Sequence, residues 1–238
     1  MGKTDDVIIN KIIKGEVILD TNQVYEYVKN SLKNKEKASV VRIGDGEALT
    51  LAQQVVLPWK QVASHGFLRY AGVKVPDFKG RDALALSIKQ ADIVGVPINM
   101  MPNFLPLTVK AFKAHNIDLN KMKLTNACIN YFLYNTGKLK SIVIDEKPRV
   151  LIIGNKGKEL SRVLKRAGAN VVGVISPVSG LNDIDRVVRS ALKQNFDLAL
   201  VAAGVPAVII CERIANGKGK VALDIGHVAN NIVKSGRF

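Results

Sequence analysis

The second half of the chain alternates short apolar runs with stretches of helical periodicity. The apolar runs are rich in β-branched residues, stop at glycine or at a polar residue, and are predicted as strands at 149–153, 171–175, 197–202 and 220–224. Helices are predicted between them, over 157–167, from 182 or 183 to 194, and over 206–215. Strands that alternate with helices of about ten residues are typical of βαβ units in a parallel sheet.

The first half is less regular but fits the same scheme. Asp20 or Thr21 can cap a helix that runs through Leu32. Strands are predicted at 39–43, 92–97 and 123–129, with a helix over 105–115. The segment 58–81 mixes aromatic residues with Pro and Gly and indicates a functional loop, while 136–147 is the best candidate for a connection between two halves.

These patterns predict one domain over 1–238, with halves at about 1–145 and 146–238 that share a single sheet. The fold class is α/β and Rossmann-like, a mainly parallel sheet with helices on both faces. With 47% hydrophobic residues and a mean hydropathy of +0.12, the chain of 238 residues is able to bury a large core. Cys128 and Cys211 lie in apolar surroundings and are expected to be small buried hydrophobic residues, with no sign of a disulfide framework or a zinc site.

The chain opens without a signal peptide, and no apolar run reaches the length of a membrane span, so we expect a soluble, cytoplasmic protein. Its net charge of +15 attracts polyanions such as nucleic acid, anionic lipid or phosphorylated substrates. The lysine cluster at 29–37 fits a solvated helix end, and the tyrosines are not interleaved with arginines as a base-stacking surface requires. An anionic acceptor or surface is therefore the stronger expectation.

The segment 39–47 carries the most specific candidate chemistry. A buried strand ends at Gly44 and is followed by Asp45, Gly46 and Glu47. Residues two apart in an extended or turning chain point to the same side, so the two carboxylates can share one Mn²⁺ or Mg²⁺ ion. Arg42 can hold a phosphate or fix a carboxylate. The alternative is ordinary Asp-Gly turn chemistry, with Glu47 in the first turn of a helix over 47–54.

Other polar or glycine-rich segments follow the remaining predicted strands, and in parallel sheets ligands bind beyond the carboxyl ends of the strands. The segments are Asn99, 126–130, 154–158, 204–206 and 224–227. Lys156 and Lys158 follow Gly154 at a helix N-terminus, which suits a phosphate. Neither the dinucleotide fingerprint nor the P-loop spacing is present, and a plain strand-to-helix turn is the alternative.

Asp224 and His227 end the last predicted strand, three residues apart, and are the candidates for a general base. The alternatives are a helix cap for Asp224 and a buried, hydrogen-bonded ring for His227. His115 is explained by its place at a helix end, and His65 is left open.

Arg42-Ile-Gly-Asp-Gly-Glu47 and Asp224-Ile-Gly-His227, taken together, resemble motifs of the GT-D fold glycosyltransferases, first described as a domain of unknown function. A strand-glycine-helix unit at 151–164 and a Gly-x-x-Ala segment at 204–207 fall in the expected order. One departure is Val228-Ala-Asn-Asn231 after the histidine, where members of the family often carry further acidic residues.

The resemblance implies a GT-D type domain that moves a sugar from a nucleotide-sugar, typically a UDP-sugar, with Mn²⁺ or Mg²⁺ bound by Asp45 and Glu47. The donor is then expected to contact Arg42, Gly44, Asp45, Gly46, Glu47, Asn126, Gly154, Lys156, Lys158 and Gly204. The cation is expected to neutralise the leaving diphosphate, and Asp224 or His227 to deprotonate the acceptor hydroxyl. The resemblance does not identify the acceptor; the net charge of +15 favours an anionic glycan or glycoprotein.

Two other functions compete with this interpretation. A basic module that binds nucleotides or RNA at the same sheet edge, without transfer activity, is the main alternative. A methyltransferase or another enzyme with a nucleotide cofactor is the second, because strands that end at glycine suit many cofactors.

Overall fold

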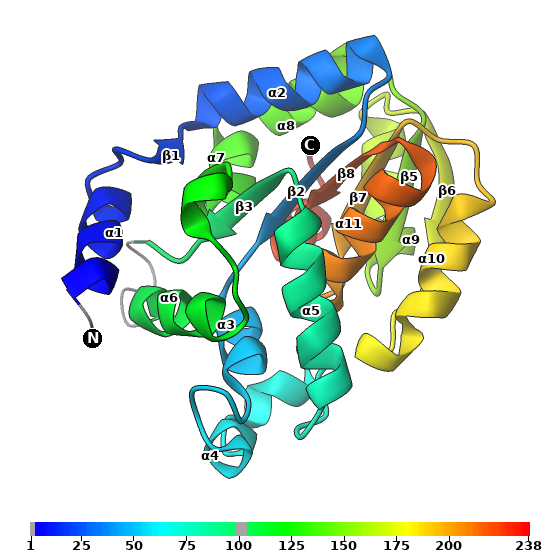
Figure 1. The fold of residues 1–238 in the computed structure, drawn as a ribbon. Coiled ribbons are helices and arrows are strands. Elements are labelled where there is room, and N and C mark those ends of the chain that lie inside the picture. The colour runs from blue at the N-terminus through cyan, green and yellow to red at the C-terminus, as the bar shows by residue number, and fades with distance from the viewer. Residues whose placement is uncertain (1–2, 99–103) are drawn as a thin grey trace.

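The computed structural model describes residues 3–98 and 104–238, so Asn99 lies outside the described residues. Within these ranges eight strands form one parallel sheet in the order β1, β4, β3, β2, β8, β7, β5, β6 (Figure 1). The strands are β1 (Ile18–Leu19), β2 (Ala38–Arg42), β3 (Ile93–Val96), β4 (Leu124–Asn126), β5 (Val150–Gly154), β6 (Val171–Ile175), β7 (Leu198–Ala202) and β8 (Val221–Asp224).

Helices cover both faces of this sheet. The α-helices are α1 (Lys3–Ile13), α2 (Thr21–Asn34), α3 (Asp45–Ala52), α4 (Trp59–Ala63), α5 (Phe78–Gln90), α6 (Phe104–Ala114), α7 (Ile129–Asn135), α8 (Lys138–Lys140), α9 (Gly157–Arg166), α10 (Ile184–Leu192), α11 (Pro206–Lys218) and α12 (Val228–Ser235). Shorter helical turns are η1 (Gly66–Arg69), η2 (Leu119–Lys121), η3 (Ser141–Asp145) and η4 (Leu181–Asp183).

The two layers of helices follow from the alternation of side chains along each strand. Val41 packs into the core that α1, α3, α5, α6, α10 and α11 share, and its neighbour Val40 packs into the core formed with α2, α7, α9 and α12. The sheet is thus apolar on both faces, which is why its strands read as continuous hydrophobic runs. The predicted α/β, Rossmann-like architecture is confirmed.

The helix that follows β8 packs on the opposite face of the sheet from the helices that follow its two neighbouring strands. This arrangement positions a candidate ligand site. β8 lies between β2 and β7. The chain leaves β8 into α12 on one face, whereas β2 and β7 are followed by α3 and α11 on the other. Neighbouring strands whose chains depart to opposite faces leave room for a ligand at their carboxyl ends. The 39–47 motif and the 224–227 motif both lie at this switch.

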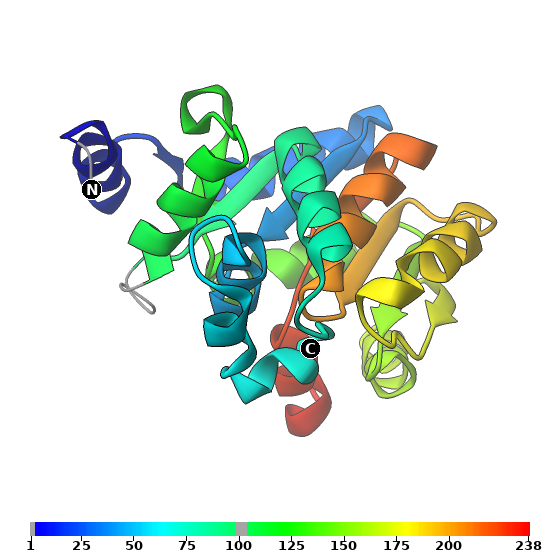
Figure 2. The ribbon, with the colours of Figure 1, turned by 60° about the horizontal axis from the view of Figure 1, so that its bottom comes forward.

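A second feature of this edge is a segment that crosses it, residues 66–77, which we call the strap. The Val205 N–H donates to the Ala71 carbonyl at 3.0 Å, and the Leu181 N–H donates to the Gly72 carbonyl at 2.9 Å. The strap therefore connects the loops that follow β7 and β6. Figure 2 shows the cyan and teal segment from α3 to α5 on the side where the strands end.

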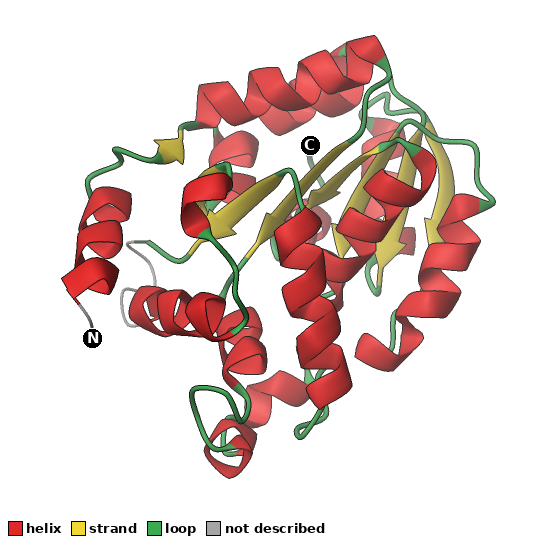
Figure 3. Ribbon diagram, viewed as in Figure 1, coloured by secondary structure: helices red, strands yellow, loops and turns green. Residues whose placement is uncertain are grey.

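Several predictions for the first half were wrong. The segment 58–81 is not a loop but contains α4, η1 and the start of α5, with Leu68 and Val73 buried (Figure 3). The segment 136–147, predicted as the connection between two halves, contains α8 and η3, and its Leu139, Ile142 and Val143 are buried in the core. Neither α1 nor α7 was predicted.

The predicted strand at 123–129 is also too long, because β4 ends at Asn126. The Asn126 side chain accepts a hydrogen bond from the Cys128 N–H at 2.8 Å, a turn that redirects the chain into α7. Cys128 and Cys211 are buried, as predicted, and within the described residues neither forms a disulfide; burial raises the pKa of both thiols. None of the helices in the described chain has the length and hydropathy that a membrane crossing requires.

Candidate functional site

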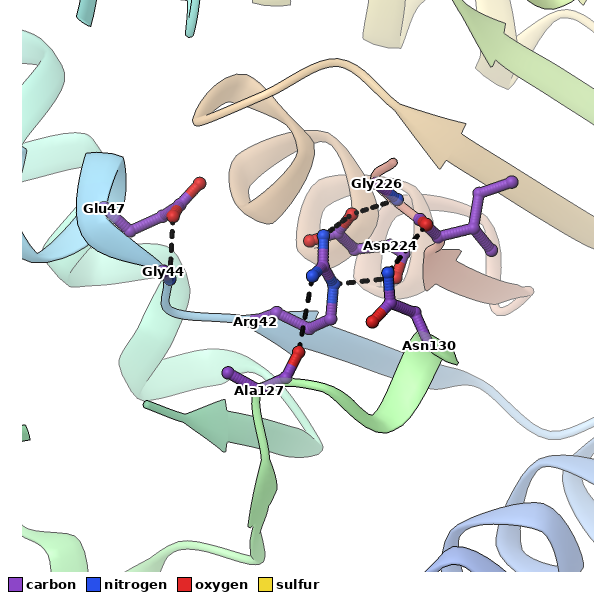
Figure 4. A network of polar contacts seen from close by, with 8 residues as sticks. Arg42, Gly44, Glu47, Ala127, Asn130, Asp224 and Gly226 are labelled. Carbon is purple, nitrogen blue, oxygen red and sulfur yellow. Dashed lines mark hydrogen bonds and ion pairs between the residues drawn. The ribbon is translucent and has the colours of Figure 1, made fainter. Parts of the chain in front are cut away.

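Arg42, the last residue of β2, reaches across to the end of β8. Its Nη2 donates to Asp224 Oδ1 at 3.0 Å and its Nε to the Asp224 carbonyl at 3.2 Å, while Nη1 donates to the Ala127 carbonyl at 3.3 Å (Figure 4). The Arg42 side chain is 19% exposed and the Asp224 side chain 3%. Of the two roles predicted for Arg42, the structure thus shows the fixing of a carboxylate.

Gly226 is required for this arrangement. Its backbone φ is +44°, and its N–H donates to Asp224 Oδ1 at 3.0 Å. A Cβ atom at position 226 would overlap the Arg42 guanidinium. The glycine of the 224–227 motif therefore both turns the chain and leaves space for the arginine of the 39–47 motif. The two motifs, near opposite ends of the chain, form one polar cluster.

Asn130 connects α7 to the same cluster. Its Nδ2 donates to the Ile225 carbonyl at 2.9 Å, and the residue is 3% exposed. Its Oδ1 accepts no hydrogen bond from the described residues. The sequence placed Asn130 in a candidate segment but did not identify it, or Gly226 and the Ala127 carbonyl, as part of the site. The roles of these three residues depend on which strands are neighbours in the sheet. The local sequence pattern around each residue does not show the order of the strands.

Asp45 and Glu47 lie in the first turn of α3, with Gly44 as its N-cap. Glu47 Oε2 accepts the Gly44 N–H at 2.8 Å, and Asp45 Oδ1 accepts the Gly46 N–H at 2.8 Å. The expected extended or turning chain is not formed, and the alternative, with Glu47 in the first turn of a helix, is the one observed. Helical positions two apart diverge by about 200° around the axis. The helix begins at Asp45, two residues before the predicted start. The other oxygen of each carboxylate accepts no hydrogen bond from the described residues.

The electrostatic environment of Glu47 is unusual for a carboxylate. Burial and the negative charge of Asp224 raise its pKa from 4.5 to about 7, although Arg42 and the hydrogen bond from Gly44 act in the opposite direction. Close to neutral pH, Glu47 thus exists in both protonation states, and a nearby cation would favour the ionised one.

Carboxylates at such an edge are candidate ligands for a metal ion. Within residues 3–98 and 104–238, no three His, Cys, Asp or Glu side chains are grouped closely enough to hold one. A closed structural metal site is therefore not formed by these residues. Although the two positions diverge around the helix, the Glu47 side chain folds back to the Gly44 N–H at the helix N-terminus, where Asp45 also lies. The second oxygens of both carboxylates can there contribute to a Mg²⁺-like cation whose remaining ligands are substrate phosphates and water.

The remaining predicted site residues fall into two groups. Gly204 lies close to the start of α3, because Cγ2 of its neighbour Val205 would stand 3.0 Å from a Cβ atom on Gly46. Gly154 ends β5, where its backbone approaches Ala202 too closely to admit a side chain. Lys156 is exposed and pairs with Glu159 at 3.6 Å, and Lys158 is exposed. Since β7 separates β5 from β8, these lysines do not contact the Arg42 cluster.

The histidines differ in their surroundings. His227 is exposed at the start of α12, and its side chain makes no capping hydrogen bond. It is thus not the buried ring that was the alternative interpretation. His115, at the end of α6, contacts the Leu51 carbonyl through Nε2 at 2.8 Å, which is a structural role.

Comparison with known proteins connects this geometry to a family. A family model described as a GT-D fold-like domain matches residues 19–232. A solved structure described as a new glycosyltransferase (DUF1792) from Streptococcus sanguinis superposes with a TM-score of 0.59 at 18% identity, covering 92% of this chain and 85% of that one.

A second structure is described as the highly conserved domain of unknown function 1792 with a distinct glycosyltransferase fold. It gives a TM-score of 0.58 at 17% identity, with 92% of this chain and 82% of that one covered. No functionally curated protein matches the chain. At these identities the structural likeness concerns the fold.

Proposed function

The chain belongs to the GT-D-like family and is thereby a glycosyltransferase, and we propose that it takes its sugar from a UDP-sugar with the help of a divalent cation. The observation that supports this most strongly is the ion pair between Arg42 and Asp224. It unites the two motifs of the family resemblance at the switch between β2 and β8, where a nucleotide is expected to bind.

The charges at the start of α3 support the need for a cation. Asp45 and Glu47 would repel a diphosphate that approaches this helix terminus directly. A divalent cation between carboxylates and diphosphate converts the repulsion into attraction, and when bound it neutralises the charge that develops on the leaving group. Arg42 is engaged by Asp224 and adds positive potential near the site without contacting the donor itself.

The proposal assigns the general base to His227 and a positioning role to Asp224. The Asp224 carboxylate is buried and receives hydrogen bonds from Arg42 and Gly226, so it is held in place within the cluster instead of being presented to an acceptor. His227 is exposed at the same edge of the sheet and is free to take a proton from an acceptor hydroxyl.

A donor screen that follows nucleotide release tests the proposal. The protein is incubated with UDP-, GDP- and ADP-sugars in the presence of Mn²⁺ or Mg²⁺, and release of the nucleoside diphosphate is measured. We expect release from one or more UDP-sugars. Release from no nucleotide-sugar, together with binding of S-adenosylmethionine, would instead support a methyltransferase.

The net charge of +15 favours one further candidate, a basic module that binds RNA. Binding that rests on charge alone falls steeply with salt and shows little sequence preference. Fluorescence anisotropy with short RNAs of different sequence distinguishes the two cases. A sequence-selective complex that survives moderate salt would favour the RNA-binding function over the glycosyltransferase.

A further inference from the structure

The strap and the loop after β6 line an open cavity of about 230 Å³ at the surface. It is lined by Arg69, Gly72, Lys74, Asp77, Ser179, Leu181 and Asn182. Cavities that hold drug-sized molecules measure about 300–1,000 Å³, so this one suits a single small group such as one sugar residue.

The cavity lies across the strap from the start of α3. On one side of the strap, Ala71 Cβ would stand 3.5 Å from a Cβ atom added to Gly46, beside Asp45 and Glu47. On the other side, Gly72 contacts Gly180 at the cavity wall. The strap thus separates the expected donor position from the cavity. Two consecutive residues, Ala71 and Gly72, face the two sides.

The cavity is also preformed. The strap backbone is hydrogen-bonded to Leu181 and Val205, and the Asp77 N–H donates to the Gln53 side chain at 2.9 Å. Gly180 has a φ of +109°, and a Cβ atom there would stand 2.5 Å from the Gly72 carbonyl oxygen. A binding site that is held open in this way loses little entropy when it is filled.

The chemistry of the lining is cationic and rich in hydrogen-bonding groups. Arg69 and Lys74 form no ion pair with any described residue, although many other cations of the chain, such as Arg186 and Arg213, are paired. The Ser179 hydroxyl and the Asn182 amide make no hydrogen bonds to the described residues. Asp77 Oδ1 accepts the Gly80 N–H at 2.7 Å as the cap of α5, which leaves its second oxygen as an acceptor.

We propose that this cavity, the strap pocket, binds the acceptor of the transfer reaction, and that the acceptor is an acidic saccharide that carries a phosphate or a carboxylate. The inference rests on the proposed function. Arg69 and Lys74 would bind the anionic group, while Asp77, Ser179 and Asn182 would bind hydroxyls. Leu181 offers an apolar surface to the ring. The donor, in contrast, binds on the Asp45 side, where its diphosphate needs a cation.

Isothermal titration calorimetry with the whole chain tests this inference. Glucose 6-phosphate, glucuronic acid and glucose serve as probes at millimolar concentration, and UDP with Mn²⁺ is titrated separately. The test variant is Arg69→Gln with Lys74→Gln. The matched control is Lys165→Gln with Lys193→Gln, because these exposed lysines lie near the C-terminal ends of α9 and α10 and the control removes the same charge.

We expect at least one acidic sugar to bind the wild-type protein more tightly than glucose. The test variant should weaken this binding about tenfold or more and the control variant less than twofold, with UDP affinity unchanged in both. The probe that binds better identifies phosphate or carboxylate as the anionic group.

Three results would overturn the inference: no binding of either acidic sugar to the wild type, equal binding of glucose, or equal weakening in the control. If UDP and Mn²⁺ bind while one of these results is found, the acceptor assignment fails and the proposed function stands. If UDP does not bind at all, the proposed function itself fails.

Discussion

Arg42 Nη2 lies 3.0 Å from Asp224 Oδ1, and the two residues are 182 positions apart in the chain. Their strands are parallel neighbours, with Val40 of β2 paired with Leu223 of β8. Both side chains are largely shielded from water, so removing either one would leave the charge of the other buried without a counter-charge. Such an unpaired buried charge lowers the stability of the folded protein. The ion pair thus couples the folding of the last strand to the position of the candidate site.

Asp224→Ala should therefore destabilise the protein by about 3–5 kcal/mol, since it leaves the Arg42 guanidinium without its counter-charge. Urea denaturation followed by circular dichroism measures the change. Asp118→Ala is the control, because Asp118 is exposed and pairs with Lys121 at the surface. An unchanged free energy of unfolding for Asp224→Ala would contradict the positioning role and return Asp224 to the candidates for the base.

Gly226→Ala should displace the Arg42 guanidinium, because the new methyl group would occupy its position. We expect lower stability, and also weaker UDP binding, because the displaced arginine no longer holds together the ends of β2 and β8 that carry the site. Gly236→Ala is the matched control: its φ of +65° is also positive, but nothing lies within 4 Å of a Cβ atom there. If the two variants behave alike, the effect comes from backbone strain and not from Arg42.

Glu47 should make stability depend on pH. Its pKa rises from 4.5 to about 7 on folding, so the folded state holds this proton more tightly than the unfolded state. The ionisation of Glu47 therefore lowers the free energy of unfolding. This loss is absent below about pH 4.5, grows as the pH rises, and is complete above about pH 7. In metal-free buffer, Glu47→Gln should gain stability relative to the wild type as pH rises across this range, on the order of 3 kcal/mol. A difference that is constant with pH would contradict the raised pKa.

His227→Ala should reduce turnover much more than it weakens UDP binding, because a base acts chiefly in the transition state. Steady-state kinetics and calorimetry give the two quantities. Asn231→Ala, an exposed polar change in the same helix, is the control. If His227 is merely structural, thermal stability would fall and turnover per folded molecule would remain nearly intact.

The fold class and most elements of the second half could be predicted from the sequence. Apolar strand patterns alternate there with helical periodicity, and this alternation is typical of βαβ units in a parallel sheet. The strand Val171–Ile175 has the predicted limits, and Asp20 caps α2 through the Gln23 N–H at 2.8 Å. The strap was misread because its few buried residues, such as Leu68 and Val73, do not form a periodic pattern.

The candidate site was predicted in its residues but not in its contacts. Arg42 and Asp224 were both named, yet their ion pair depends on β8 inserting beside β2, which only the order of strands determines. The two carboxylates were expected to point to the same side of an extended or turning chain, whereas both lie in the first turn of a helix whose N-cap is Gly44. Local sequence patterns thus indicated which residues belong to the candidate site. Which of their side chains contact one another depends on the order of the strands in the sheet.

The most direct test of the account is UDP binding measured by calorimetry with and without Mn²⁺, in the wild type, Asp45→Ala, Glu47→Ala and the control Asp118→Ala. If Asp45 and Glu47 share a cation with the donor diphosphate, Mn²⁺ should strengthen UDP binding in the wild type and in the control. Asp45→Ala and Glu47→Ala should both abolish this gain. UDP binding that is independent of Mn²⁺ and unchanged in Glu47→Ala would contradict the account.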